Sequence, residues 1–166
     1  MTASDKYFLK AREDYPFNID ELTEALDYGL SHDDEHAGLL TLKGLVYWEH
    51  LGQFAAAREC FELALLSDNT YINAYYAYVR FSTAVAEETK ATKLLAGLGK
   101  LKGTDKAYIA WLEAKLHESK ERYADAVGKM KEAKQHSCCK QCGIFYNDEL
   151  ERVRAKKKSL KDAKQD

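Results

Sequence analysis

The fold of this chain is decided by the stretch Gln53-Phe54-x-x-Ala57-x-x-x-Phe61-x-x-Ala64, whose pattern returns as Arg122-Tyr123-x-x-Ala126-x-x-x-Met130-x-x-Ala133. A partial copy, Glu88-x-x-Ala91-x-x-x-Leu95, lies between the two. We call Ala57, Ala91 and Ala126 the marker alanines. They are 34 and 35 residues apart, and self-similarity at such a period indicates a stack of repeated supersecondary units.

The pattern predicts the second helix of a helical hairpin. Small alanines on one helix face let a neighbouring helix approach closely, and the large residue between them fills the remaining space. A helical stretch precedes the first and third markers, at residues 39–50 and 107–119, and Gly52 marks the clearest turn. A weaker copy around Ala25 predicts a degenerate first hairpin.

Apolar spacing predicts an all-α chain in which the last segment covers the end of the stack. Helices are predicted over residues 3–13, 19–31, 35–50, 54–67, 72–84, 87–98, 105–119, 122–136 and 138–162. The last hairpin of an open stack would expose its apolar face without a cap. A capping stripe is expected at positions three or four apart, namely Cys139, Cys142, Tyr146, Leu150 and Val153.

With 166 residues the chain is expected to form one domain. We divide it into a degenerate hairpin at 1–36, repeats at 37–70, 71–104 and 105–138, and a capping helix with a basic tail at 139–166.

The first full unit resembles the tetratricopeptide repeat (TPR) family. The residues that carry the resemblance are Gly44, Tyr47, Gly52, Phe54, Ala57, Phe61 and Ala64. The match covers about residues 37–136, but the first unit has one extra residue before Gly52, and the middle unit lacks the turn glycine and turn aromatic. The resemblance implies an α-solenoid of about three to four TPR-like hairpins that binds other proteins in a concave groove lined by the first helices.

By that resemblance, aromatic and basic residues of the first helices are the candidates for partner binding. The groove candidates are Trp48, Tyr76, Arg80, Tyr108, Trp111 and Lys115. The alternative is that each aromatic serves ordinary packing between repeats. Family members that hold chaperone C-terminal carboxylates use a lysine and asparagine clamp. The corresponding positions here hold Thr41, Leu45, Tyr76, Arg80, Trp111 and Lys115, so that use is not expected. We expect a protein-interaction scaffold or adaptor that binds a peptide segment of a partner.

The densest set of possible metal ligands is His136, Cys138, Cys139 and Cys142, which contains one Cys-x-x-Cys. A metal or thiol-dependent site is therefore an alternative function. No second Cys-x-x-Cys accompanies it, and cysteines on the expected capping stripe would serve as small apolar residues. We expect structural thiols, no bound metal and no cofactor.

Charge suggests a third alternative, a structural subunit that self-associates through oppositely charged ends. Residues 1–83 hold 6 Lys and Arg against 14 Asp and Glu, which gives −8, whereas the rest hold 19 against 13, which gives +6. The basic run from Arg152 to Lys164 has interleaved acids and is read as a solvated helix face, so nucleic-acid binding is not expected.

Sequence motifs give no support for catalysis or membrane insertion. The chain has no glycine-rich phosphate loop, no Gly-x-Ser-x-Gly and no His-Glu-x-x-His, so we expect no enzyme and no catalytic residues. No stretch approaches the roughly 18 apolar residues of a spanning helix, and the first residues do not resemble a secretory signal. A cytoplasmic location is therefore expected.

Overall fold

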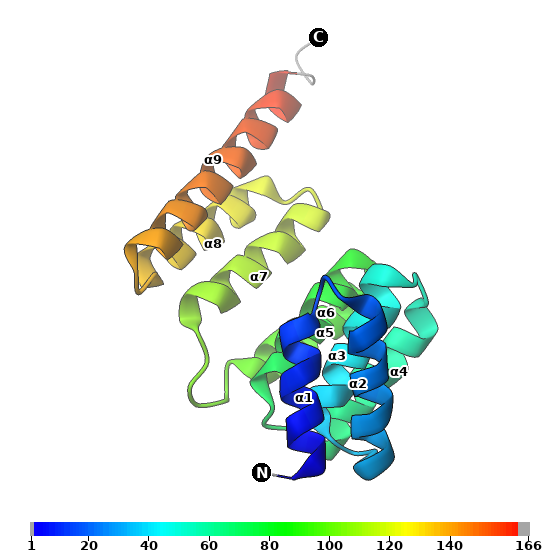
Figure 1. Cartoon of the computed structure of the whole chain (residues 1–166). Coiled ribbons are helices and arrows are strands. Elements are labelled where there is room, and N and C mark those ends of the chain that lie inside the picture. Colours follow the sequence, from blue (N-terminus) through cyan, green and yellow to red (C-terminus); the bar gives the residue numbers. More distant parts are fainter. Residues whose placement is uncertain (1, 163–166) are drawn as a thin grey trace. The chain divides into compact units, whose positions relative to one another are not determined.

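A computed structural model describes residues 2–162, and this part of the chain is entirely helical (Figure 1). It contains nine α-helices and one short π-helical turn, η1, without a strand between residues 2 and 162. The elements are α1 (Ala3–Asp14), α2 (Ile19–His32), α3 (Ala37–Leu45), η1 (Val46–His50), α4 (Phe54–Ser67), α5 (Ile72–Ala84), α6 (Glu88–Leu98), α7 (Lys106–Ser119), α8 (Tyr123–His136) and α9 (Lys140–Asp162). The predicted all-α class is confirmed, and every predicted helix begins and ends within two residues of an observed one.

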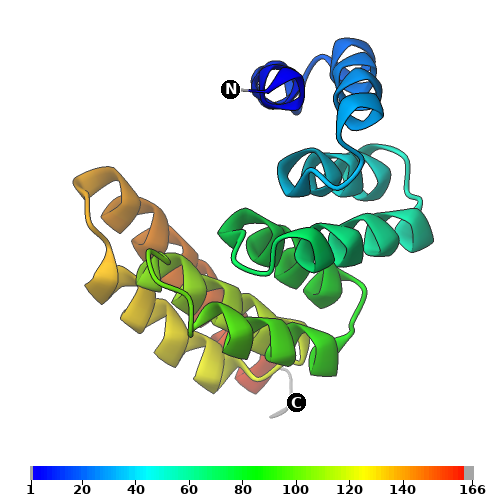
Figure 2. The ribbon, with the colours of Figure 1, turned by 90° about the horizontal axis from the view of Figure 1, so that it is seen from below.

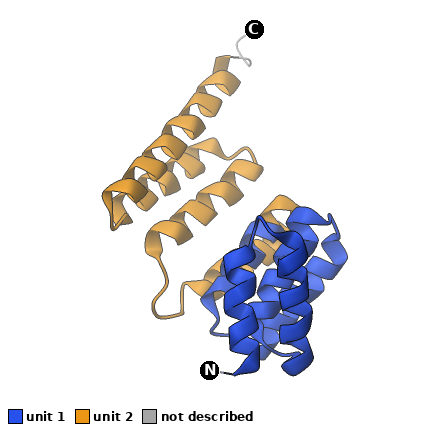
Figure 3. Cartoon of the chain, in the orientation of Figure 1, with its two compact units in different colours: residues 1–81 blue, residues 82–166 orange. Residues whose placement is uncertain are grey.

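The chain divides into two compact units (Figure 3). Unit 1 comprises residues 1–81 and unit 2 comprises residues 82–166, so the boundary falls inside α5. Each unit has buried apolar side chains from several helices.

Unit 1 is built from antiparallel hairpins. The α1–α2 and α3–α4 hairpins lie in successive layers (Figure 2), with α3 in contact with α1, α2 and α4. Phe61 of α4 is fully buried, and its ring faces Gly44 of α3. A Cβ at Gly44 would lie 2.7 Å from the Phe61 ring, so only glycine permits this close approach of α3 and α4.

Unit 2 places α9 over the α7–α8 hairpin as a cap. Leu150 and Val153 of α9 are buried in one cluster with Ala114 of α7 and with Ala126 and Met130 of α8. The predicted capping stripe is thus occupied at its later positions.

The first position of the predicted stripe is wrong. Cys139 precedes the first residue of α9 and is exposed, and Cys142 is half-buried. α9 begins at Lys140, and its buried residues start at Tyr146, one turn after Cys142.

One backbone feature recurs at the spacing of the marker alanines. All three are 0% exposed, as predicted. Five residues before each marker, at Gly52, Ala86 and Glu121, φ is positive, at 63°, 61° and 57°. The left-handed conformation ends one helix and turns the chain into the next. Ala86 and Glu121 therefore adopt the turn conformation in the two repeats that lack a turn glycine, although a side chain makes this conformation costly.

The π turn η1 accommodates the extra residue of the repeat at 37–70. In the repeat at 71–104 the Glu87 N–H donates to the Ser82 carbonyl, five residues back, at 2.8 Å. In the repeat at 105–138 the Arg122 N–H donates in the same way to the His117 carbonyl, also five residues back. In the repeat at 37–70 the Gln53 N–H donates to the Tyr47 carbonyl, six residues back, at 2.7 Å. One residue is absorbed in Val46–His50, where a π-bulge inserts it without breaking the helix.

Overpacking at the last marker tests whether the hairpin alignment is correct. We expect Ala126→Leu to lower the free energy of unfolding by about 1 to 3 kcal/mol, because the larger side chain has no space between α7, α8 and α9. Chemical denaturation followed by circular dichroism measures the change. Ala124→Leu, on the exposed face of the same helix, is the matched control and should have a much smaller effect. Equal effects at both positions would contradict the alignment.

Candidate functional site

In unit 1 the structure brings two of the groove candidates together. The Arg80 guanidinium carbon of α5 lies 5.5 Å from the Trp48 ring centroid of η1, a cation–π contact. The same guanidinium donates to the Glu49 carboxylate at 2.8 Å. The remaining groove candidate of unit 1, Tyr76, is half-buried on α5, one turn before Arg80.

The unit 1 indole is held from two sides. Trp48 meets the buried Phe81 edge-on, with centroids 5.7 Å apart, while Arg80 covers it from above the ring. The Tyr15 hydroxyl also donates a hydrogen bond to Glu49, and burial, together with this hydrogen bond, raises the pKa of Tyr15. The trio of Trp48, Glu49 and Arg80, which we call the unit 1 patch, is therefore held by contacts within the trio and with Phe81 and Tyr15.

In unit 2 the structure brings all three groove candidates of that unit together. The rings of Tyr108 and Trp111 on α7 stack with centroids 5.2 Å apart, and the Lys115 ammonium lies 5.3 Å from the Trp111 ring centroid. From α9, Phe145 approaches Trp111 with centroids 6.1 Å apart. Glu149 of α9 accepts a hydrogen bond from the Trp111 indole at 3.3 Å. We call these five residues the unit 2 patch.

Sequence reasoning missed the α9 residues of this patch and the ion pairs that hold α9 against α7. Arg152 donates two hydrogen bonds to Glu118, at 2.6 and 2.7 Å, and two to Glu149, at 2.9 and 3.2 Å. The Lys115 ammonium lies 2.5 Å from Glu149. A signal was present, because Glu118 and Arg152 are 34 residues apart, as are Glu88 and Arg122, which also pair. Within unit 2, opposite charges separated by the repeat period indicate contact between successive hairpins.

Ion pairing explains the low pKa values of the two carboxyl groups. The hydrogen bonds from Arg152 lower the pKa of Glu118 to about 2. Burial alone would raise the pKa of Glu149, but hydrogen bonds from Arg152 and Lys115 outweigh it and lower the pKa to about 2. Both groups are therefore permanently charged members of a structural network.

This network makes the stability of unit 2 sensitive to acid. A carboxyl whose folded pKa is about 2 against an ordinary 4.5 stabilises the fold above pH 4.5, and the contribution disappears as the pH falls toward 2. We expect Glu118→Gln to lower the free energy of unfolding at neutral pH by about 1.5 to 3 kcal/mol, since the side chain is only 11% exposed. Denaturation curves over this pH range should show the difference from wild type shrinking.

The matched control is Glu151→Gln. Glu151 pairs with Arg154 at 2.6 Å on the same helix, but its side chain is 57% exposed. Such a surface pair contributes little, so stability should hardly change at any pH. If the two variants behave alike, the Glu118 network does not hold α9 in place.

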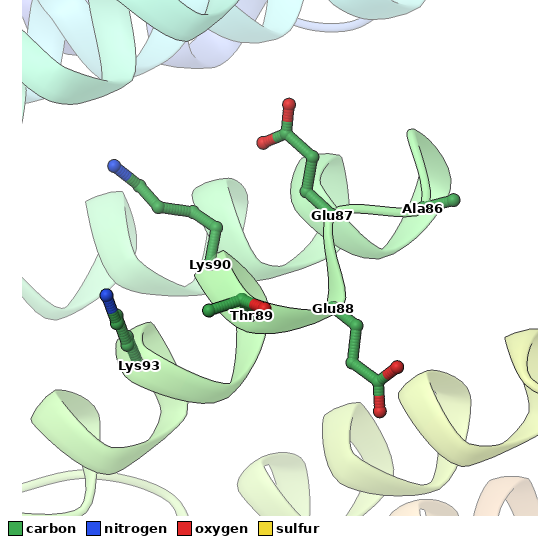
Figure 4. A pocket seen from close by; sticks show the side chains of 6 residues that line it. All are labelled: Ala86, Glu87, Glu88, Thr89, Lys90 and Lys93. Carbon is green, nitrogen blue, oxygen red and sulfur yellow. The ribbon is translucent and has the colours of Figure 1, made fainter.

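Two depressions of unit 2 lie outside the patches. One, of about 450 Å³, is lined at the start of α6 by Ala86, Glu87, Glu88, Thr89, Lys90 and Lys93 (Figure 4). The Lys90 and Lys93 amines extend to the same side of α6, whereas Glu88 points to the opposite side, where it pairs with Arg122. The second, of about 430 Å³, is lined by residues of α6 and α7 that include Leu95 and His117. Neither is lined by a groove candidate.

The cysteine cluster lies at the start of α9. The sulfur atoms of Cys138, Cys139 and Cys142 are all within 4.8 Å of one another, and His136 is not part of this group. The Cys139 sulfur accepts a hydrogen bond from the Cys142 N–H at 3.1 Å. Hydrogen bonding to Cys142 lowers the pKa of the Cys139 thiol, and the Cys139 sulfur raises the pKa of Cys142 to about 11.

The basic run at the end of the chain is partly neutralised. Arg154 pairs with Glu151, and Lys156 pairs with Glu118 at 2.7 Å. The last lysine of the run, Lys164, and the end of the predicted segment at 163–166 lie outside the described residues. Within residues 2–162, none of the helices has both the length and the apolar character needed to cross a bilayer.

No protein-family model matches the chain, and no curated protein or solved structure is significantly similar to it. Its function is therefore inferred from the residues and their geometry.

Proposed function

We propose that this chain is a protein-interaction scaffold of the tetratricopeptide type, a solenoid of helical hairpins that holds a peptide segment of a partner protein. The groove candidates on the first helices are the binding residues. The protein acts in the cytoplasm, by binding rather than by catalysis.

The observation that supports the proposal best is an arrangement present in both units. In each, a half-buried tryptophan lies beneath a cation, Arg80 on Trp48 and Lys115 on Trp111, and a neighbouring glutamate holds the cation. Rigid aromatic anchors of this kind dominate binding energy in protein interfaces. Because the rings are already ordered by their neighbours, a partner loses less free energy in fixing them.

The same geometry changes the expected role of the two cations. Arg80 and Lys115 are each paired with a carboxylate of the chain, at 2.8 and 2.5 Å, so a partner carboxylate would have to displace Glu49 or Glu149. The cations therefore orient the indoles and set the local charge. The partner segment is expected to bind chiefly through apolar or aromatic side chains that pack on the exposed ring edges.

Affinity capture from the native cell tests the proposal. Immobilised wild-type chain should retain a partner that the Trp48→Ala and Trp111→Ala chains retain poorly, and mass spectrometry identifies it. The matched control is Phe17→Ala, which removes an aromatic that is 87% exposed and lies between α1 and α2, outside both patches. A partner retained equally by all four chains would contradict binding through the patches.

A further inference from the structure

Three cysteines at the start of α9 form a cluster that packing does not explain. Buried cysteine behaves as a small apolar residue, and Cys60 of α4 is an example. In contrast, Cys138 and Cys139 are exposed, and of the three only Cys142 packs against an apolar cluster. Two thiols therefore face solvent beside a third, an arrangement that brings no burial of apolar surface.

The spacing of the three sulfur atoms is close to what one metal ion requires. A zinc–sulfur bond is about 2.3 Å long, so two thiolates on one ion lie less than about 4.6 Å apart. Here all three sulfur atoms lie within 4.8 Å of one another. The three sulfur atoms therefore lie near the separation that a shared ion needs.

The local backbone places hydrogen-bond donors beside the sulfur of Cys139. Cys139 occupies the position before the first residue of α9, and its sulfur accepts the Cys142 N–H at 3.1 Å. Unpaired N–H groups at a helix start carry partial positive charge, which stabilises a thiolate there. α9 has 23 residues, so its first turn is well supported by the rest of the helix.

We propose that Cys138, Cys139 and Cys142 bind one thiophilic d¹⁰ cation, Zn²⁺ or Cu⁺, through three thiolates. Soft sulfur ligands select these ions over Mg²⁺ and Ca²⁺. Each thiol that binds releases its proton to water, and no electron is transferred, so the step needs no oxidant. His136 lies outside the cluster, so Zn²⁺ would keep a fourth position open for water or for a donor from another molecule. The ion fixes the connection between α8 and α9.

Titration of the reduced, metal-free full chain with Co²⁺ tests the site. We expect uptake of one equivalent with a thiolate-to-cobalt charge-transfer band, followed by loss of the band when one equivalent of Zn²⁺ is added. Competition with a Cu⁺-specific chelator then shows which of the two ions the site holds more tightly. Cys138→Ser, Cys139→Ser and Cys142→Ser should each weaken Co²⁺ binding by about tenfold or more.

Two controls separate the cluster from other donors. Cys60→Ala removes the remaining thiol, and His136→Ala removes the nearest histidine in sequence, and both should bind Co²⁺ like wild type. Circular dichroism establishes that the serine variants are folded. Absence of the charge-transfer band in the reduced wild-type chain, or a band that persists in all three serine variants, would overturn the proposal.

Discussion

Replacing Leu150 by alanine is expected to lower the free energy of unfolding of unit 2 by about 2 to 5 kcal/mol. Leu150 is 3% exposed and packs in the cluster that joins α9 to α7 and α8. Two of its neighbours, Ala114 and Ala126, are too small to move into the space that its side chain leaves. The loss therefore combines the transfer free energy of the missing atoms with the cost of a cavity. The effect is large because few residues of the highly charged α9 are buried.

The chain offers a direct way to measure this effect in unit 2 alone. It has two tryptophans, Trp48 in unit 1 and Trp111 in unit 2. In a Trp48→Phe background, Trp111 fluorescence during chemical denaturation reports on the region where α9 docks. Ile144→Ala is the matched control, because Ile144 is 47% exposed on the same helix, and it should cost well under half as much. Equal costs would show that α9 does not cap the hairpin.

Much of the fold could be predicted because repeated packing constraints leave repeated residues. A helix approaches its neighbour closely only where a small side chain allows it, and each marker alanine is fully buried. Helix ends were predictable within two residues because the apolar periodicity is interrupted at the turns. The later part of the capping stripe followed from the same periodicity, since Leu150 and Val153 are spaced to share one face.

Other features depend on physics that a single sequence does not display. Ala86 and Glu121 adopt the left-handed conformation that glycine adopts at the first turn, because the flanking helices fix the turn geometry. The extra residue before Gly52 was visible, but not its accommodation as a π turn. Cys139 was placed on the buried stripe because periodicity does not tell where α9 begins, and this residue lies before the helix with its side chain exposed.

The candidate site was predictable in part. Tyr108, Trp111 and Lys115 share one face of α7 by their spacing, and the structure brings them together. The contributions of Phe145 and Glu149 depend on which face of α9 meets α7, and many of the polar residues of α9 can form ion pairs. Only the pairing of charges one repeat apart would have indicated that face.

Trp111→Ala is expected to weaken partner binding by at least about 2 kcal/mol, roughly thirtyfold in Kd, and much more than Lys115→Ala does. The indole is the largest ring of the unit 2 patch and is held by contacts with Tyr108, Phe145 and Glu149. Lys115→Ala leaves Glu149 still paired with Arg152, so no buried charge loses its only partner. That variant should change mainly the association rate and its salt dependence. Surface-based binding kinetics with the captured partner measure both effects.

Because Trp111 also packs against the core of unit 2, its loss could act through the fold, and a second variant separates the two causes. Phe145 contacts Trp111 but is 48% exposed, so Phe145→Ala should leave unit 2 folded while removing one edge of the patch. It should weaken binding by an amount between the other two variants. Circular dichroism and denaturation curves must match wild type for this comparison. If folded Phe145→Ala and Trp111→Phe chains both bind the partner with wild-type affinity, the partner does not bind on the face formed by α7 and α9.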